Sequence, residues 1–176
     1  MAGRRLLWFD HVAARDGEGA VEGWKSAAYA SRRAACVESS PHIPDDDPRA
    51  LMTPGELASL AACRGVEIGA HTARHAILAH ASPARQRDEI ADSRDAIARW
   101  TGRPVRAFAY PNGRPGIDYS ADTVKVVGDL GFDFAFTLRP SFAMATEPAL
   151  ERSRFLIVAE VSAAELAHRL AFAWPR

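Results

Sequence analysis

The most informative segment of this chain is Glu67-Ile68-Gly69-Ala70-His71-Thr72-Ala73-Arg74-His75, because it joins a strand pattern to a histidine pair. Val66-Glu67-Ile68 alternates apolar and polar residues, as a short β-strand does. His71 and His75 follow four residues apart, beyond the carboxyl end of the predicted strand, where α/β folds place their sites. Two imidazoles at this spacing can bind one divalent ion, with zinc as the leading candidate. The alternative is a polar loop whose histidines lead into a helix.

The sequence argues against two classes of hydrolase. Zincin metalloproteases also have histidines four apart, but theirs lie within a helix and a Glu follows the first one. Here Thr72 follows His71, and a predicted strand precedes the pair. A serine hydrolase would need a Gly-x-Ser-x-Gly turn, and the sequence contains none.

Helix and strand patterns alternate from residue 51 onward. A Ser or Thr that can cap a helix precedes each predicted helix, and the first three helices end at a glycine. Such alternation indicates parallel strands joined by crossover helices. A full eight-unit barrel takes about 250 residues, so 176 residues predict an open sheet or an incomplete (β/α) barrel. The predicted helices cover 53–65, 82–102, 120–131 and 162–170, and the predicted strands cover 66–68, 105–110, 132–137 and 155–158.

A second motif, Phe108-Ala109-Tyr110-Pro111-Asn112-Gly113, ends the next predicted strand. Pro111 and Gly113 favour a tight turn, which can direct a backbone N–H into a cleft. On its own, this motif would be an ordinary turn from a strand into a loop.

Both motifs, in this order and separated by one amphipathic helix, resemble the polysaccharide deacetylase (NodB-homology) family. The family's second motif reads His-Ser/Thr-x-x-His, usually after Glu-Ile-Gly, and residues 67–75 match it. A branch of the family carries Phe-Ala-Tyr-Pro-x-Gly, which residues 108–113 match. The resemblance extends over about residues 51–160.

The resemblance implies a distorted (β/α) barrel and a metal-dependent hydrolase that removes N-acetyl groups from carbohydrate. An Asp-His-His triad holds the family's divalent metal, usually zinc, so His71 and His75 correspond to metal ligands. Tyr110, Pro111 and Asn112 correspond to the turn at the substrate, where the Asn112 N–H would face the oxyanion. The implied partner is an N-acetylated carbohydrate or a related small amide.

The family's first motif, Thr-Phe-Asp-Asp-Gly, has no match, and it supplies the third ligand and the catalytic base. Trp8-Phe9-Asp10-His11 echoes it, which makes Asp10 the one candidate, although the same segment also resembles a Trp-Asp helix of the family. The general-acid histidine of the late strand has no match in residues 155–158, and His168 is predicted to lie on a helix surface.

These departures predict an N-terminally truncated member, with an atypical helical or loop segment at 1–50 and a partial deacetylase domain at 51–176. A start-site error, a gene fragment and a real loss stay open as causes. The alternative function is a catalytically inactive carbohydrate- or metal-binding remnant. A missing strand would also leave an unpaired sheet edge through which the chain could self-associate.

Composition narrows the partners and the compartment. The 22 Lys and Arg residues balance the 22 Asp and Glu residues, which argues against nucleic acid as the main partner. No window is apolar enough for a transmembrane segment, and the start of the chain does not read as a signal peptide. The cytoplasm is therefore the default expectation, although many family members act outside it. Cys36 and Cys63 are either free thiols or one disulfide.

Overall fold

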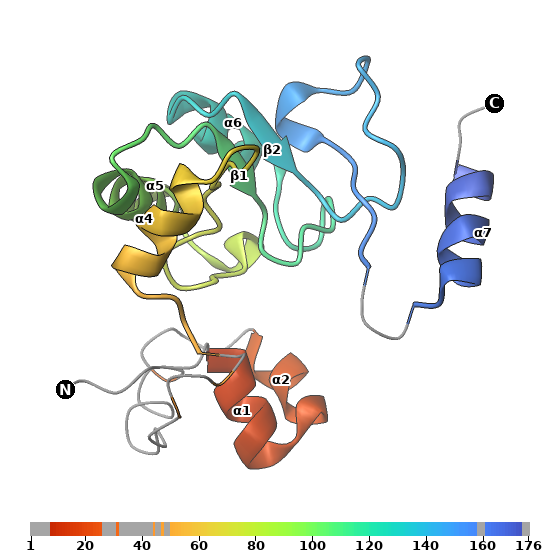
Figure 1. The fold of residues 1–176 in the computed structure, drawn as a ribbon, viewed down its shortest axis with the longest axis horizontal. Helices are drawn as coiled ribbons and strands as arrows, with labels where there is room; N and C mark the ends of the chain where they lie inside the picture. Colours follow the sequence, from red (N-terminus) through yellow and green to blue (C-terminus); the bar gives the residue numbers. More distant parts are fainter. Residues whose placement is uncertain are drawn as a thin grey trace. The chain divides into compact units, whose positions relative to one another are not determined.

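The computed structural model describes residues 8–25, 31, 44, 47, 50–157 and 161–173. The chain divides into two compact units (Figure 1). The first unit comprises residues 1–66 with 100–102, and the second comprises residues 67–99 with 103–176. The predicted domain organisation, with a boundary at residue 50, stays a prediction.

Two short helices pack against each other in the first unit, α1 (Trp8–Asp16) and α2 (Glu18–Lys25). The Arg15 guanidinium lies 5.7 Å from the centre of the Trp24 ring, a cation–π contact between the two helices. The segment that echoes the first family motif is therefore helical from Trp8 onward.

The helix α4 (Pro54–Ala62) starts as its sequence predicts. The Thr53 side chain accepts the Glu56 N–H, and the Glu56 carboxylate accepts the Thr53 N–H at 2.7 Å. Pro54 lies in the first turn, where a missing N–H costs nothing. The capping box thus determines where this helix begins.

The same capping chemistry starts the long helices of the second unit. Ser82 Oγ accepts the Arg85 N–H at 3.4 Å, and Ser120 forms a capping box with Thr123. Arg94 Nη1 on α5 donates to the Leu130 carbonyl just after α6 at 2.6 Å, which ties the two helices together. The helices of this unit are η1 (Leu78–His80), α5 (Pro83–Thr101, up to residue 99), α6 (Ala121–Asp129), η2 (Ala149–Glu151) and α7 (Ala163–Ala173).

A small parallel sheet forms the centre of the second unit (Figure 1). β1 (Ala107–Ala109) pairs with β2 (Phe134–Phe136), with Phe108 opposite Ala135. Single parallel bridges join Ala70 to Phe108 on one side and Phe136 to Arg152 on the other. Four chain segments thus run in parallel, in the order that alternating helices and strands predict.

The predicted α/β class is confirmed, because the structure combines helices with a small parallel sheet. Of the two predicted forms, the described residues show the open sheet and no barrel. The predicted strands at 66–68 and 155–158 are wrong: residues 66–68 and 155–157 are not strands, and residue 158 lies outside the described range. Each outer segment pairs at one residue only, Ala70 or Arg152. The positive φ of Thr72, 62°, ends the extended backbone two residues after the first bridge. The second bridge directly follows the helical turn η2.

One face of the sheet is packed into the core. Phe108 and Ala135 on this face are 1% and 0% exposed, whereas Phe134 on the opposite face is 46% exposed. Ala107, Ala109 and Phe136 on that opposite face are half-buried. Parallel sheets usually have both faces covered, whereas the described residues cover this face, which we call the bare face, only in part. The core consists of Ala70, Leu78, Ile90, Val105, Phe108, Tyr110, Tyr119, Val127, Phe132 and Ala135.

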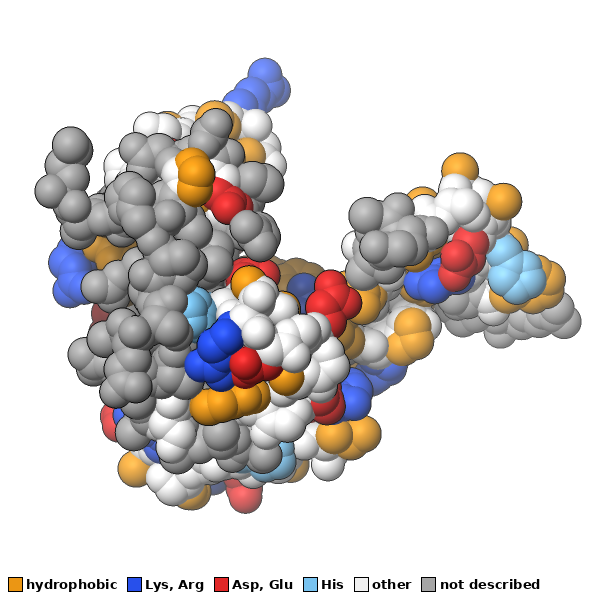
Figure 2. Space-filling model, turned by 90° about the horizontal axis from the view of Figure 1, so that it is seen from below, with side chains coloured by type: hydrophobic (Ala, Val, Ile, Leu, Met, Phe, Trp, Pro, Cys, Tyr) orange, Lys and Arg blue, Asp and Glu red, His pale blue; other side chains and the backbone are white. Residues whose placement is uncertain are grey.

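Exposed apolar side chains also occur on α7, where Leu170 and Phe172 are 37% and 72% exposed. Figure 2 shows hydrophobic groups at the surface on the face that it presents, interspersed with charged groups.

Cys63 is a free, exposed thiol, and Cys36 lies outside the described residues. None of the helices in the described ranges is long and apolar enough to cross a membrane.

Candidate metal centre

His71 lies one residue beyond the Ala70 bridge, and its ring is fixed by the neighbouring strand. Its Nδ1 is 2.7 Å from the carbonyl oxygen of Ala109. A carbonyl can only accept a hydrogen bond, so Nδ1 carries the proton and donates it. In the neutral ring the lone pair is then on Nε2, and a backbone carbonyl that orients the ring in this way is typical of metal-binding histidines.

The environment of His71 favours the neutral form of its imidazole. Burial lowers its pKa below the usual value, and the positive charge of Arg154 acts in the same direction. The hydrogen bond to Ala109 opposes them but does not outweigh them. Arg154 is itself held nearby, since its Nε donates to the Thr137 carbonyl at 2.9 Å. A neutral ring has the free lone pair that a metal ligand requires.

The two histidines of the pair lie side by side. The centres of the His71 and His75 rings are 4.8 Å apart, with an angle of 72° between the planes. Thr72 and His75 have positive φ angles of 62° and 52°, which cost on the order of 1–3 kcal/mol each in residues other than glycine. Thr72 Oγ1 stabilises the turn by accepting the Ala76 N–H at 3.1 Å.

The pair can supply two of the donor atoms that a divalent ion needs. Its nitrogens are of the right chemical type, and the tautomer of His71 leaves Nε2 available. In the part of the chain that the structure describes, no group of three His, Cys, Asp or Glu side chains could hold a metal ion. Asp10, the sequence candidate for the third ligand, lies in the first turn of α1 in the first unit. A complete ligand set would therefore need donors beyond the histidine pair.

The predicted substrate turn follows β1, but its first two side chains belong to the core. Tyr110 is 0% exposed, stacks on Tyr119 with ring centres 3.9 Å apart, and donates its hydroxyl to the Leu150 carbonyl at 2.9 Å. Pro111 is also fully buried. Burial raises the pKa of Tyr110 far above its usual value, so this hydroxyl stays protonated. Tyr110 can therefore present only its backbone to a substrate.

Asn112 occupies the tip of the turn with a positive φ of 58°. The Gly113 N–H donates to the Pro111 carbonyl at 2.7 Å, which closes a tight three-residue turn around Asn112. Asn is one of the few residues that tolerate a positive φ. The sequence therefore suits the turn, although the motif alone does not reveal its conformation.

Sequence reasoning missed the residue that supports this turn, Asp118, which is 3% exposed. Its carboxylate accepts hydrogen bonds from the Arg114 N–H at 2.9 Å and from Arg114 Nε at 2.8 Å. Burial is the largest single influence and raises its pKa, but the Arg114 contacts and a hydrogen bond with the Asn112 side chain bring the net pKa below 3.8. The spacing of Arg114 and Asp118, four residues apart, was the available signal.

A groove of about 440 Å³ runs along the bare face of the sheet and reaches His71. Its lining is mainly apolar and includes Ala107, Ala109 and Phe136, together with the charged residue Glu67. His71 therefore borders a surface where a ligand has apolar area to contact.

The fold is similar to that of solved bacterial deacetylases. The deacetylase PplD of Streptococcus pyogenes, solved in complex with acetate, aligns with 70% of this chain and 52% of its own, at 26% identity and a TM-score of 0.61. The polysaccharide deacetylase BC0361 of Bacillus cereus aligns with 70% of this chain and 38% of its own, at 24% identity and a TM-score of 0.59. This chain thus spans about half of the first structure and less of the second.

A search of curated protein sequences found no match. The family model described as polysaccharide deacetylase matches residues 32–135. That range includes the histidine pair and the turn at residues 110–113, and it makes up more than half of the chain. The chain therefore belongs to the polysaccharide deacetylase family.

Proposed function

We propose that this protein is a metal-dependent hydrolase that removes N-acetyl groups from carbohydrate. The observation that carries the proposal is the His71–His75 pair, with its rings 4.8 Å apart and His71 Nδ1 bound to a backbone carbonyl. The family supplies the reaction class, and the acetate bound to PplD supports an acetyl group as the part removed. An N-acetylated sugar, or a related small amide, is the proposed substrate.

In this proposal His71 and His75 hold a divalent ion, most suitably Zn²⁺. When bound, such an ion polarises the amide carbonyl and lowers the pKa of a water molecule. The Ala109 carbonyl orients the His71 ring through Nδ1. The turn at residues 110–113 supplies backbone N–H groups of the kind that stabilise an oxyanion, and the Asn112 N–H is our candidate.

A second candidate function is a carbohydrate- or metal-binding protein without catalysis. It is favoured by one observation: the described residues gather no third ligand beside the histidine pair. Among the described residues, we assign no carboxylate as the general base. A general base typically contributes about 10²–10⁴-fold to a rate. Asp10 remains the one candidate for that group.

The two functions separate in a paired assay of zinc content and acetate release. Zinc is measured after dialysis in the wild type, in a His71→Ala, His75→Ala variant, and in a His80→Ala, His168→Ala control that removes two exposed histidines. Release of acetate from N-acetylglucosamine oligomers is measured in the same samples with zinc added. Zinc that is lost only with the pair, together with turnover, supports the hydrolase.

Zinc binding without turnover favours the non-catalytic function. If the wild type retains no more zinc than the His71→Ala, His75→Ala variant, both candidate functions are excluded in the form that depends on a metal held by the pair. Turnover that disappears in Asp10→Asn would assign Asp10 a catalytic role.

A further inference from the structure

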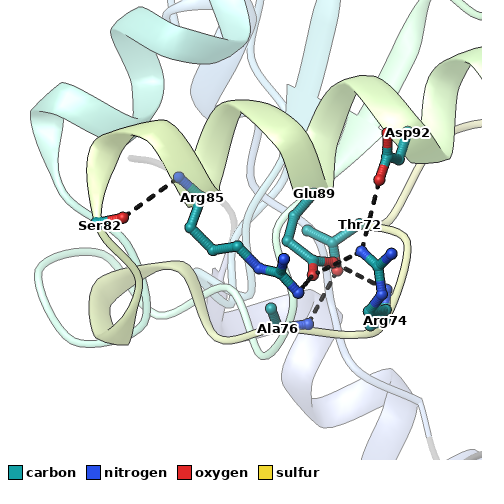
Figure 3. Close-up of polar contacts among 7 residues, drawn as sticks. All are labelled: Thr72, Arg74, Ala76, Ser82, Arg85, Glu89 and Asp92. Atoms are coloured by element: carbon teal, nitrogen blue, oxygen red, sulfur yellow. Dashed lines mark hydrogen bonds and ion pairs between the residues drawn. The ribbon is translucent and has the colours of Figure 1, made fainter. Parts of the chain in front are cut away.

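A buried carboxylate on α5 points toward the loop that carries the histidine pair (Figure 3). Glu89 is 0% exposed, yet it carries two charge-bearing oxygens. A buried carboxylate is costly unless it is paired and hydrogen-bonded. The partners of Glu89 therefore indicate what its burial stabilises.

Those partners come from the histidine loop and from α5 itself. Glu89 Oε2 accepts the Arg74 backbone N–H at 3.0 Å, and Oε1 accepts Arg74 Nη1 at 3.1 Å. Arg85 Nη2, one helical turn before Glu89, lies 2.8 Å from Oε1. We name Glu89, Arg74 and Arg85 the carboxylate clamp (Figure 3).

The helix holds the same loop at two further backbone groups. The Ala73 N–H donates to the Glu89 backbone carbonyl at 2.9 Å, and the His71 N–H donates to Ser93 Oγ at 3.3 Å. Three N–H groups of the loop, those of His71, Ala73 and Arg74, are thus bound by residues of α5. Of these three contacts, the one to Arg74 is made by a charged side chain, and charge-assisted hydrogen bonds are the stronger kind.

The loop needs such support because its backbone is strained. Thr72 and His75 both have positive φ, and for a β-branched residue such as Thr this conformation is rare. Strained conformations persist only where the surrounding structure determines them. Arg74 lies between these two residues, and the Glu89 carboxylate binds both its backbone N–H and its guanidinium.

We propose that Glu89 is a positioning residue for the histidine pair. Its carboxylate holds Arg74, and this fixes the backbone between His71 and His75 so that the two rings stay within reach of one divalent ion. The identity of the ion rests on the proposed function, whereas the conformation of the loop does not. Residues that orient metal ligands indirectly typically change metal affinity 10–100-fold when they are mutated.

The test compares Glu89→Gln with two control variants. Glu89→Gln keeps the size of the side chain but replaces one acceptor oxygen by an NH₂ group, which faces the Arg donors. Asp92→Asn removes an exposed carboxylate 3.5 Å from the same Arg74 guanidinium and leaves the loop backbone bonds intact. Ile90→Ala creates a cavity at a core residue that is 0% exposed, and it removes none of the clamp's hydrogen bonds.

Two measurements are made on the purified full chain. The first is amide hydrogen exchange of residues 71–76 without metal, followed by NMR. The second is the dissociation constant for Zn²⁺ alone, measured by competition with a chelator. We expect Glu89→Gln to speed exchange at Arg74 at least tenfold and to weaken zinc binding about tenfold, while Asp92→Asn changes each by less than twofold.

The proposal is overturned if Glu89→Gln exchanges and binds zinc like the wild type. It is also overturned if Ile90→Ala changes both measurements as much as Glu89→Gln does, because general destabilisation would then explain the result. If the wild type binds no zinc but Glu89→Gln still speeds exchange across the loop, the positioning role stands and the proposed function falls.

Discussion

Gly113 is the position at which a single methyl group should disturb the turn beside the histidine pair most. Its φ is +73°, and a Cβ added there would lie 2.9 Å from the Leu138 nitrogen and 3.1 Å from the Tyr110 carbonyl oxygen. Both of these are backbone atoms, which cannot rotate away as a flexible side chain can. Gly113→Ala therefore imposes an unfavourable backbone conformation and a steric clash together.

The expected loss follows from these two effects. A left-handed backbone costs an L-residue about 1–2 kcal/mol, and overpacking costs about 1–3 kcal/mol. Their sum, roughly 2–5 kcal/mol, is a large part of a typical domain stability of about 5–15 kcal/mol. Gly116 offers a matched control, since its φ is +74° but a Cβ there would meet nothing within 4 Å. Gly116→Ala should cost only the backbone part, about 1–2 kcal/mol.

The assay is a urea titration followed by circular dichroism, with the free energy of unfolding extrapolated to water and the slope compared among the variants. Gly113→Ala should lose more stability than Gly116→Ala by about 1–3 kcal/mol. Equal losses in the two variants would refute the claim that the chain packs closely around Gly113.

Two further predictions concern pH and association. The pKa of Asp118 is lower in the folded protein than its ordinary value of 3.8, so its contribution to stability is present above that value and is lost as pH falls through the lowered one. The stability difference between wild type and Asp118→Asn should therefore shrink below pH 3.8 in urea titrations, and a difference that is constant with pH would contradict this. The bare sheet face and the outer segments of the sheet, each paired at a single residue, should promote self-association. In sedimentation experiments Phe134→Lys should reduce it, whereas Ile117→Lys, at a residue 58% exposed and outside the sheet, should not; equal effects would argue against the sheet as the interface.

Local chemistry that the sequence displays directly was predicted well. The starts of α4, α5 and α6 depend on Thr53, Ser82 and Ser120, whose side chains bind N–H groups within the same turn. Such contacts need no distant partner, so the sequence is enough to predict them. The two motifs identified the family for the same reason, because each is a continuous run of residues.

The extent of the sheet could not be predicted in this way. Alternation at residues 66–68 resembles a strand, but a strand exists only where a neighbour accepts its hydrogen bonds. The first segment meets its neighbour at Ala70 and the last at Arg152, each by a single bridge. The position of a bridge depends on the paths of two segments, which neither segment encodes alone.

The family, the order of helices and parallel segments, and the histidine pair as the candidate metal centre all follow from the amino-acid sequence alone. Three features became visible in the folded chain: Tyr110 is a core residue, the Ala109 carbonyl sets the tautomer of His71, and Glu89 contacts the histidine loop. The Ala109 carbonyl is 38 residues from His71, and Glu89 is 15 residues from Arg74. These contacts depend on the direction in which folded elements bring their atoms together, and no local pattern of residues records that direction.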